Sequence, residues 1–285
     1  RREAIASDLA ASVTLGVGQF CTNPGLVLLQ ESDEEKNFHE QFSAKIEQAN
    51  SGVMLSSSIR QNYVHGIEKI KNTLGVAVLA TGKEEGSGYR AVPSVFTANA
   101  NSFINDNSLE EEVFGPSTLI VTAKTRSELI EAAEKLGGHL TATIHGTESD
   151  LQEFADLVKI LEQKAGRLIL NAYPTGVEVC HAMVHGGPFP ATSDSRTTSV
   201  GTSAIVRFAR PVCYQNFPDN VLHDELKNSN PLGIVRLVDG TWQSKRDRIV
   251  ADGQFHREPT RFRNWITVDG EAGPTGEGGF RAEPD

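Results

Sequence analysis

Short apolar runs alternate with stretches of helical periodicity through the first two thirds of the chain. Runs such as 76–80 and 118–121 are rich in valine, leucine and isoleucine, which indicates buried strands. The stretches between them carry apolar residues at helical spacing and follow serine or threonine residues suited to cap a helix. This alternation is typical of α/β proteins. It predicts a mainly parallel sheet with flanking helices.

Serine, threonine and glycine punctuate the expected helices. The expected capping boxes are Ser32 with Glu35, Thr125 with Glu128, and Ser149 with Gln152. A further helix is expected to begin at Ser57 or Ser58 and to end before Gly75. The expected strands are 25–29, 76–80, 118–121, 139–144 and 167–170.

Composition excludes several classes of partner. The chain has 285 residues, enough for one large or two ordinary domains, and its 27 basic and 37 acidic side chains give a net charge of −10. A broad basic surface for nucleic acid is therefore not expected. No apolar run approaches the ~20 residues of a membrane span, and the first residues lack the apolar core of a secretory signal. Three widely spaced cysteines form no disulfide framework, so we expect a cytoplasmic protein.

Cys21 lies in a run of small and flexible residues, 16–24, directly before the apolar run 25–29. Glycines let the backbone approach a substrate closely, and the strand behind them holds the thiol in place. This setting favours a nucleophile. The alternative is a small buried hydrophobe on a loop.

Three segments carry a family resemblance. The run Gly18-Gln19-Phe20-Cys21-Thr22-Asn23-Pro24 resembles the catalytic cysteine segment of the aldehyde dehydrogenase superfamily, and Glu111-Glu112-Val113-Phe114-Gly115-Pro116 resembles its second signature. Residues 171–177 and 185–192 are similar to one branch, the NADP-using 2,5-dioxovalerate (α-ketoglutaric semialdehyde) dehydrogenases. The similarity extends to about Leu237.

The resemblance implies a reaction and a site. Cys21 would attack an aldehyde, NADP or NAD would take hydride from the thiohemiacetal, and water would hydrolyse the thioester to a carboxylate. Glu112 and Phe114 match the positions that hold the nicotinamide ribose, although residues 110–112 alone indicate a solvated acidic run. Phe189 would form a wall of the aldehyde pocket or else anchor a loop.

Parts of the family machinery are expected elsewhere. The general base and the nucleotide-binding sheet belong, by the resemblance, further upstream than the twenty residues before Cys21. The sequence thus predicts a partial enzyme that works with a separate nucleotide-binding half or as a homo-oligomer. Residues 204–212 are β-rich, and the resemblance makes the segment near 204–215 a strand that adds to a neighbouring subunit's sheet. The alternative is a non-catalytic α/β assembly module or a degenerate partial enzyme.

Three other patterns suggest ligands or catalysis. The glycines at 16 and 18 lack the third glycine and the following helix of a dinucleotide fingerprint. Cys180, His181 and His185 are spaced like metal ligands, but no second pair completes a site, and we expect no metal. A pair of Cys21 with His181 or His185 leaves a cysteine hydrolase as a further alternative.

The last residues differ in character from the rest. We expect a catalytic domain over 1–237 and a tail over 238–285 that is polar and rich in glycine. Segments 252–255, 262–267 and 273–280 resemble the N-terminal arm of xi-class glutathione transferases, the glutathionyl-hydroquinone reductases. No cysteine follows Cys213, so no transferase chemistry is assigned. The tail is expected to be extended or disordered.

Overall fold

The computed structural model describes residues 2–243. The chain divides into two units, Arg1–Ala209 and Arg210–Asp285. The first unit contains the predicted sheet and helices. The boundary near residue 237 between a catalytic domain and a tail stays a prediction.

The central sheet of the first unit has four strands in the order β1-β6-β5-β3. The strands β1 (Leu26–Gln30), β6 (Ser117–Ala123) and β5 (Ser94–Asn99) run parallel, and β3 (Val76–Thr81) pairs antiparallel with β5. A separate parallel pair consists of β7 (His139–Ile144) and β8 (Ala165–Leu170). The predicted mainly parallel sheet is confirmed.

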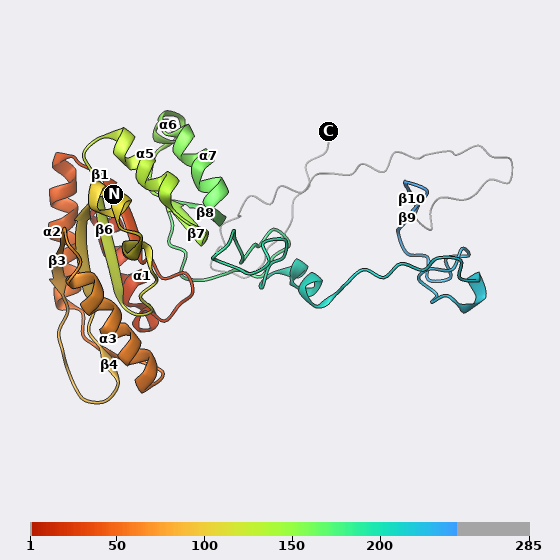
Figure 1. The fold of residues 1–285 in the computed structure, drawn as a ribbon, viewed down its shortest axis with the longest axis horizontal. Coiled ribbons are helices and arrows are strands. Elements are labelled where there is room, and N and C mark those ends of the chain that lie inside the picture. Colours follow the sequence, from red (N-terminus) through yellow and green to blue (C-terminus); the bar gives the residue numbers. More distant parts are fainter. Residues whose placement is uncertain (1, 244–285) are drawn as a thin grey trace, which may run out of the picture. The chain divides into compact units, whose positions relative to one another are not determined.

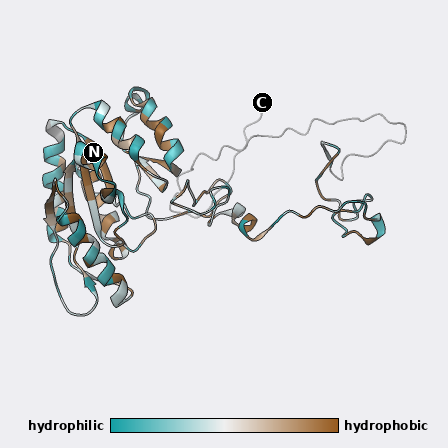
Figure 2. Cartoon of the chain, viewed as in Figure 1, coloured by the Kyte–Doolittle hydropathy of each residue, from teal (hydrophilic) through white to brown (hydrophobic). Residues whose placement is uncertain are grey.

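Helices cover both faces of the central sheet (Figure 1). One face packs against α1 (Arg2–Thr14) and α2 (Asp33–Gln48), and the other against α3 (Ser57–Lys71), α4 (Ala100–Asn105), α5 (Arg126–Lys135) and α7 (Ala155–Lys164). Side chains of β6 alternate between them, since Ile120 packs with α1 and α2 while Leu119 and Val121 pack with α4 and α5. Figure 2 accordingly shows hydrophobic colour on the strands and mixed colour on the helices.

Short elements connect these layers. They are the 3-10 helices η1 (Leu15–Gly18) and η2 (Asn107–Glu110), the paired strands β2 (Gly52–Val53) and β4 (Arg90–Ala91), and the helix α6 (Glu148–Glu153).

Capping residues set the helix starts, in part as predicted. The side-chain oxygen of Ser32 accepts a hydrogen bond from the backbone of Glu35, and that of Thr125 accepts one from Glu128, so both predicted caps are confirmed. The cap of α3 is Ser56, one residue before the predicted start.

The expected start at Ser149 is wrong. Thr147 caps α6 in a reciprocal capping box with Asp150. The single helix expected beyond it is two helices, α6 and α7, separated at Phe154, whose φ of −102° and ψ of 33° depart from helical values.

The strand expected over 204–212 is also absent from the described part of the chain, where Thr202–Phe208 form the 3-10 helix η3. Local bonds replace strand pairing, since the amide of Ala204 donates to the carbonyl of Gly201 at 3.1 Å. A strand needs a neighbouring edge to pair its amides, and within the described residues this segment pairs with no strand. Ile205 and Phe208 are 72% and 89% exposed.

The second unit contains η4 (Asp219–Val221) and a hairpin of β9 (Arg236–Val238) and β10 (Thr241–Gln243). Asp239 and Gly240 join its strands with φ of 48° and 77°, the positive values of a type I′ turn. The remainder of the predicted tail, 244–285, lies outside the described residues. Within residues 2–243, no helix is both long enough and apolar enough to cross a lipid bilayer.

Candidate active site

Cys21 follows a tight reversal of the chain at the end of α1. Gly16, Val17 and Gly18 have φ of 55°, 59° and 64°, so three successive residues adopt the left-handed region. A Cβ on Gly18 would lie 2.2 Å from the carbonyl carbon of Gly115, which only glycine avoids. The turn presents Cys21 as an exposed free thiol directly before β1.

The thiol loop packs against the segment that contains Phe114. The side-chain amide of Asn23 donates to the carbonyl oxygen of Gly115 at 3.1 Å, and Gly18 abuts the same peptide. The structure therefore brings the loops of Cys21 and Phe114 into direct contact. Phe114 is 38% exposed at this junction.

Tyr63 of α3 packs against the loop that contains Phe114 and Gly115. A Cβ on Gly115 would lie 2.2 Å from the ring of Tyr63, so the backbone of this loop rests on the aromatic face. Tyr63 is 1% exposed, and its hydroxyl donates to the carbonyl of Val92 at 2.6 Å. Burial raises the pKa of this phenol well above its ordinary value. The support is a neutral, buried and hydrogen-bonded side chain.

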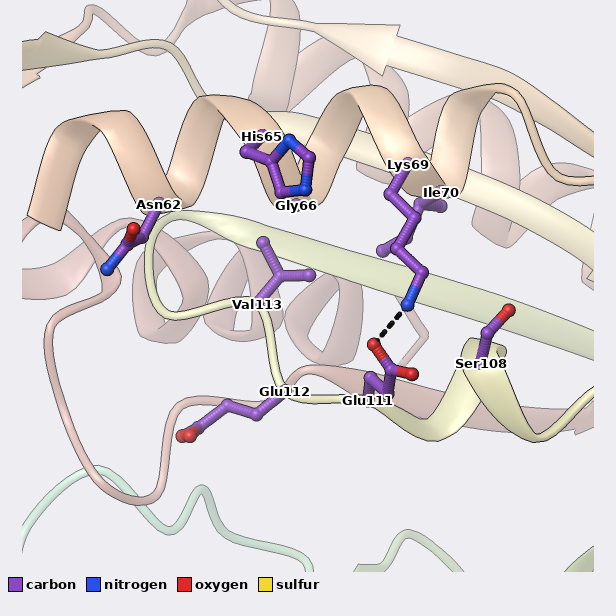
Figure 3. A pocket seen from close by; sticks show the side chains of 9 residues that line it. All are labelled: Asn62, His65, Gly66, Lys69, Ile70, Ser108, Glu111, Glu112 and Val113. Atoms are coloured by element: carbon purple, nitrogen blue, oxygen red, sulfur yellow. Dashed lines mark hydrogen bonds and ion pairs between the residues drawn. The ribbon is translucent and has the colours of Figure 1, made fainter.

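Glu112 lines a cavity of about 260 Å³ between α3 and residues 108–113 (Figure 3). The lining residues are Asn62, His65, Gly66, Lys69, Ile70, Ser108, Glu111, Glu112 and Val113. Lys69 forms an ion pair with Glu111, whereas the side chain of Glu112 extends away from that pair (Figure 3). Among the described residues, Glu112 has no hydrogen-bond or ion-pair partner. Its carboxylate is thus free to accept hydrogen bonds from a ligand.

The loop that follows β8 contacts the thiol loop through Pro174 and His185. The buried hydroxyl of Thr22 donates to the carbonyl of Pro174 at 2.9 Å, and Arg167 of β8 donates to the same carbonyl at 2.9 Å. The Sγ atom of Cys21 lies 3.2 Å from Nε2 of His185. Residues 164 positions apart in the sequence are therefore in hydrogen-bond contact.

Burial and a neighbouring charge decide the protonation state of His185. Burial lowers the pKa of His185, and the positive charge of Arg167 lowers it further, so the imidazole is neutral at pH 7. Burial also lowers the pKa of Arg167, which the negative charge of a Cys21 thiolate opposes. Guanidinium remains charged at any ordinary pH. A thiol, a neutral imidazole and a cation thus share one corner of the fold.

From the sequence, His185 was one of two histidines that might pair with Cys21. It was also part of a metal-like spacing with Cys180 and His181 and the first residue of the 185–192 similarity, while Arg167 was not placed in the site. Its position in a glycine-rich loop long enough to line a site was a further signal. His185 contacts Cys21, whereas His181 is exposed. Among residues 2–243, no three histidine, cysteine or acidic side chains gather as metal ligands would.

Phe189 lies in the same loop and is 81% exposed. Its role beside the aldehyde stays a prediction.

Comparisons with known proteins agree with this arrangement. Residues 2–188 match the model of the aldehyde dehydrogenase family. The chain is 45% identical over 240 residues to alpha-ketoglutaric semialdehyde dehydrogenase 2 of Azospirillum brasilense, and 45% identical over 241 residues to the alpha-ketoglutaric semialdehyde dehydrogenase of Acinetobacter baylyi. Each match covers 84% of this chain and 46% of the relative, so the chain spans about half the length of these curated relatives.

Other matches concern the second resemblance and the fold. A stretch of 51 residues, 18% of this chain and 16% of the relative, is 49% identical to the glutathionyl-hydroquinone reductase YqjG of Escherichia coli, which confirms the second predicted resemblance. Gamma-glutamyl-gamma-aminobutyraldehyde dehydrogenase of Burkholderia cenocepacia has a similar fold, with a TM-score of 0.59 at 18% identity over 72% of this chain and 41% of that one.

PnpE in complex with nicotinamide adenine dinucleotide has a TM-score of 0.58 at 22% identity, over 72% and 42% of the two chains. The fold, the thiol loop and the family model lead to one assignment. The chain belongs to the aldehyde dehydrogenase family.

Proposed function

We propose that this chain carries the thiol-bearing half of an NAD(P)-dependent aldehyde dehydrogenase, with Cys21 as its nucleophile. One observation carries the proposal: the exposed sulfur lies in a loop that packs directly on the loop of Phe114. A nucleophile beside a nicotinamide-binding segment is what transfer of hydride from a covalent adduct requires.

In the proposed reaction the Cys21 thiolate adds to the aldehyde carbon, and the carbonyl electrons move to oxygen to give a thiohemiacetal. The backbone N–H of Cys21 has no acceptor among the described residues, so it is available to stabilise that oxyanion. Loss of hydride leaves a thioester on the sulfur. Water then hydrolyses the thioester to a carboxylate and returns the thiol.

Bound NADP or NAD would supply the hydride acceptor. The residues present fit such a group, because the free carboxylate of Glu112 borders a cavity of about 260 Å³ and can accept hydrogen bonds from the two hydroxyls of a ribose. Phe114, 38% exposed beside the thiol loop, would pack against the nicotinamide ring. The nicotinamide adenine dinucleotide named in the PnpE structure supports this class of cofactor.

The substrate we propose is α-ketoglutaric semialdehyde, which is 2,5-dioxovalerate, or a similar small aldehyde. The names of the two relatives at 45% identity support this choice. Phe189 would become a wall of the aldehyde pocket once a substrate or another subunit covers its exposed ring.

We place the general base and the nucleotide-binding sheet of the working enzyme outside these 285 residues, since each match covers 46% of the relative. A separate nucleotide-binding half would supply them. The exposed Ile205 and Phe208 in the predicted 204–215 segment offer an apolar surface for assembly with that half or with a second copy of the chain.

The test measures reduction of NADP and of NAD by the chain, alone and mixed with the separately expressed nucleotide-binding half of the Azospirillum brasilense relative. With 2,5-dioxovalerate as substrate, we expect reduced nicotinamide in at least one arrangement. Cys21→Ser should abolish it, and Cys180→Ser should not. No reduction of NADP or NAD in any arrangement would instead favour a non-catalytic assembly module.

A further inference from the structure

Cys21 and His185 form a sulfur–nitrogen contact that the proposed reaction does not yet use. The Sγ–Nε2 distance is 3.2 Å, within hydrogen-bond range for sulfur. Two hydrogen bonds fix the backbone of His185: its amide donates to Thr198 Oγ1 at 2.7 Å, and its carbonyl accepts from the amide of Ser199 at 3.0 Å. Thr198 is itself buried. The imidazole is therefore positioned by backbone bonds that a side-chain substitution leaves in place.

The direction of the hydrogen bond follows from the charge on the sulfur, because a thiolate can only accept. Nδ1 of His185 is buried and has no partner among the described residues in either tautomer, so it does not select one. A proton on Nε2 points at the sulfur. The neutral ring then donates to Sγ, and it can do so most strongly when the sulfur is a thiolate.

Arg167 supplies a fixed positive charge to the same corner. Its two terminal nitrogens donate to the carbonyls of Pro174 at 2.9 Å and Gly176 at 3.2 Å. No ion-pair partner of Arg167 lies among the described residues, so no carboxylate neutralises it. The carbonyl of Pro174 also accepts from Thr22, the residue after Cys21, so the guanidinium is held beside the thiol loop, where its charge favours a negative sulfur.

We propose that His185 and Arg167 stabilise the thiolate of Cys21, His185 by donating Nε2–H to the sulfur and Arg167 by its positive charge. Within the described residues, His185 and Arg167 are the titratable and charged groups that interact with the thiol. Ionisation releases the thiol proton to water, since Cys21 is exposed. His185 stays neutral throughout and is a hydrogen-bond donor rather than the base. The inference rests on the proposed function only for the use of Cys21 as nucleophile.

The test is the pH dependence of alkylation of Cys21 by iodoacetamide, in the full chain with Cys180 and Cys213 replaced by serine. The rate follows the thiolate fraction, so its midpoint reports the thiol pKa. We expect a midpoint below the free-cysteine value of about 8.5. His185→Asn and Arg167→Met should each lower the rate at pH 7 about tenfold, as an upward pKa shift of about one unit requires.

Conservative variants separate the chemistry from a structural role. His185→Gln, which can place an amide N–H near the position of Nε2, and Arg167→Lys, which keeps the charge, should each restore part of the rate. His181→Asn and Arg196→Met are matched controls, because His181 is exposed and Arg196 pairs with Asp194 on the surface. These two should titrate like the parent.

Two results overturn the inference. One is a midpoint at or above the free-cysteine value in the chain whose only thiol is Cys21, which thiolate absorbance in the ultraviolet also measures. The other is an unchanged profile in folded His185→Asn and Arg167→Met. Alkylation needs neither cofactor nor aldehyde. A lowered midpoint without nicotinamide reduction would therefore reject the proposed function and keep this inference. Nicotinamide reduction with an unlowered midpoint would keep the proposed function and reject this inference.

Discussion

Asn23 donates its side-chain amide to the carbonyl oxygen of Gly115 at 3.1 Å, across 92 positions of sequence. The same carbonyl accepts from the backbone amide of Ser117 at 2.8 Å, where β6 begins. The bond thus ties the thiol loop to the first residues of a central strand. Because Phe114 directly precedes Gly115, the bond also sets how far the sulfur lies from the proposed nicotinamide segment.

Asn23→Ala removes this bond. We expect it to lower the free energy of unfolding by about 1 kcal/mol, the usual net value of such a hydrogen bond. Asn23→Asp should cost more, because a carboxylate cannot donate to the carbonyl and Oδ1 is buried without a partner among the described residues. Urea unfolding followed by circular dichroism measures both. Equal stability of both variants and the parent would mean that the contact contributes nothing.

Gly18→Ala tests the close approach of the two loops. Its Cβ would lie 2.2 Å from the carbonyl carbon of Gly115 at a φ of +64°. We expect a loss of about 1–2 kcal/mol from the left-handed backbone and a further ~1–3 kcal/mol from the clash. Gly88→Ala is the matched control, since Gly88 has a φ of +95° with nothing within 4 Å of an added Cβ. Thermal unfolding should separate the two variants, and equal losses would refute the packing argument.

The sequence predicted the elements whose signals are local. Ser32 and Thr125 were assigned as caps because each precedes an apolar helical stripe, and both caps are confirmed. The strand β5 (Ser94–Asn99) was not among the expected strands, although four of its six residues are buried. It is bounded by Pro93 and an Asn-capped helix and holds Ser, Thr and Asn, so a short polar-looking run concealed a central strand.

The site was predictable only where a segment carries its own pattern. Cys21 lies in a recognisable run, but its contact with His185 joins residues 164 positions apart, which no spacing encodes. Two histidines in one loop, His181 and His185, were equivalent in sequence. Their difference arises only in the folded chain, where backbone hydrogen bonds of His185 with Thr198 and Ser199 hold its imidazole against the thiol.

Tyr63→Phe tests the support below Gly115 and its pH dependence. Burial raises the pKa of Tyr63, so above about pH 10 the unfolded chain loses a proton that the folded chain keeps. Stability therefore falls as pH rises beyond that value. We expect the free energy of unfolding of the variant to fall by about 1 kcal/mol at pH 7, because phenylalanine lacks the hydroxyl that bonds the carbonyl of Val92. Its stability should also decline less steeply at alkaline pH.

Some alkaline decline should remain in that variant, because burial, and then the charge of Asp8, also raises the pKa of Tyr173. Tyr89→Phe is the control, since Tyr89 is 53% exposed. Unfolding measured at several pH values above neutrality provides the comparison. If the free energy of unfolding falls with pH equally steeply in Tyr63→Phe and in the parent, the raised pKa of Tyr63 does not cause the alkaline decline.

Glu112→Gln and Glu111→Gln distinguish the two neighbouring carboxylates. Glu112 borders the cavity without a partner among the described residues, whereas Glu111 pairs with Lys69 (Figure 3). In the arrangement that reduces nicotinamide, we expect Glu112→Gln to raise the KM for NADP about tenfold, because a neutral amide accepts ribose hydroxyls less strongly. Glu111→Gln should leave that KM within about twofold, as expected for an exposed ion pair. The opposite ranking would reject Glu112 as the ribose ligand.

Phe189→Ala tests the proposed aldehyde wall. The ring is 81% exposed, so its removal should change the free energy of unfolding by less than about 0.5 kcal/mol. If substrate covers the ring, the loss of buried apolar area should raise the KM for aldehyde by about 10- to 100-fold, and the KM for NADP should stay constant. Phe208→Ala, at an 89% exposed ring of η3, is the control for loss of an exposed aromatic. Steady-state kinetics with each substrate varied in turn separates these outcomes, and an unchanged aldehyde KM in Phe189→Ala would make this residue a loop anchor instead.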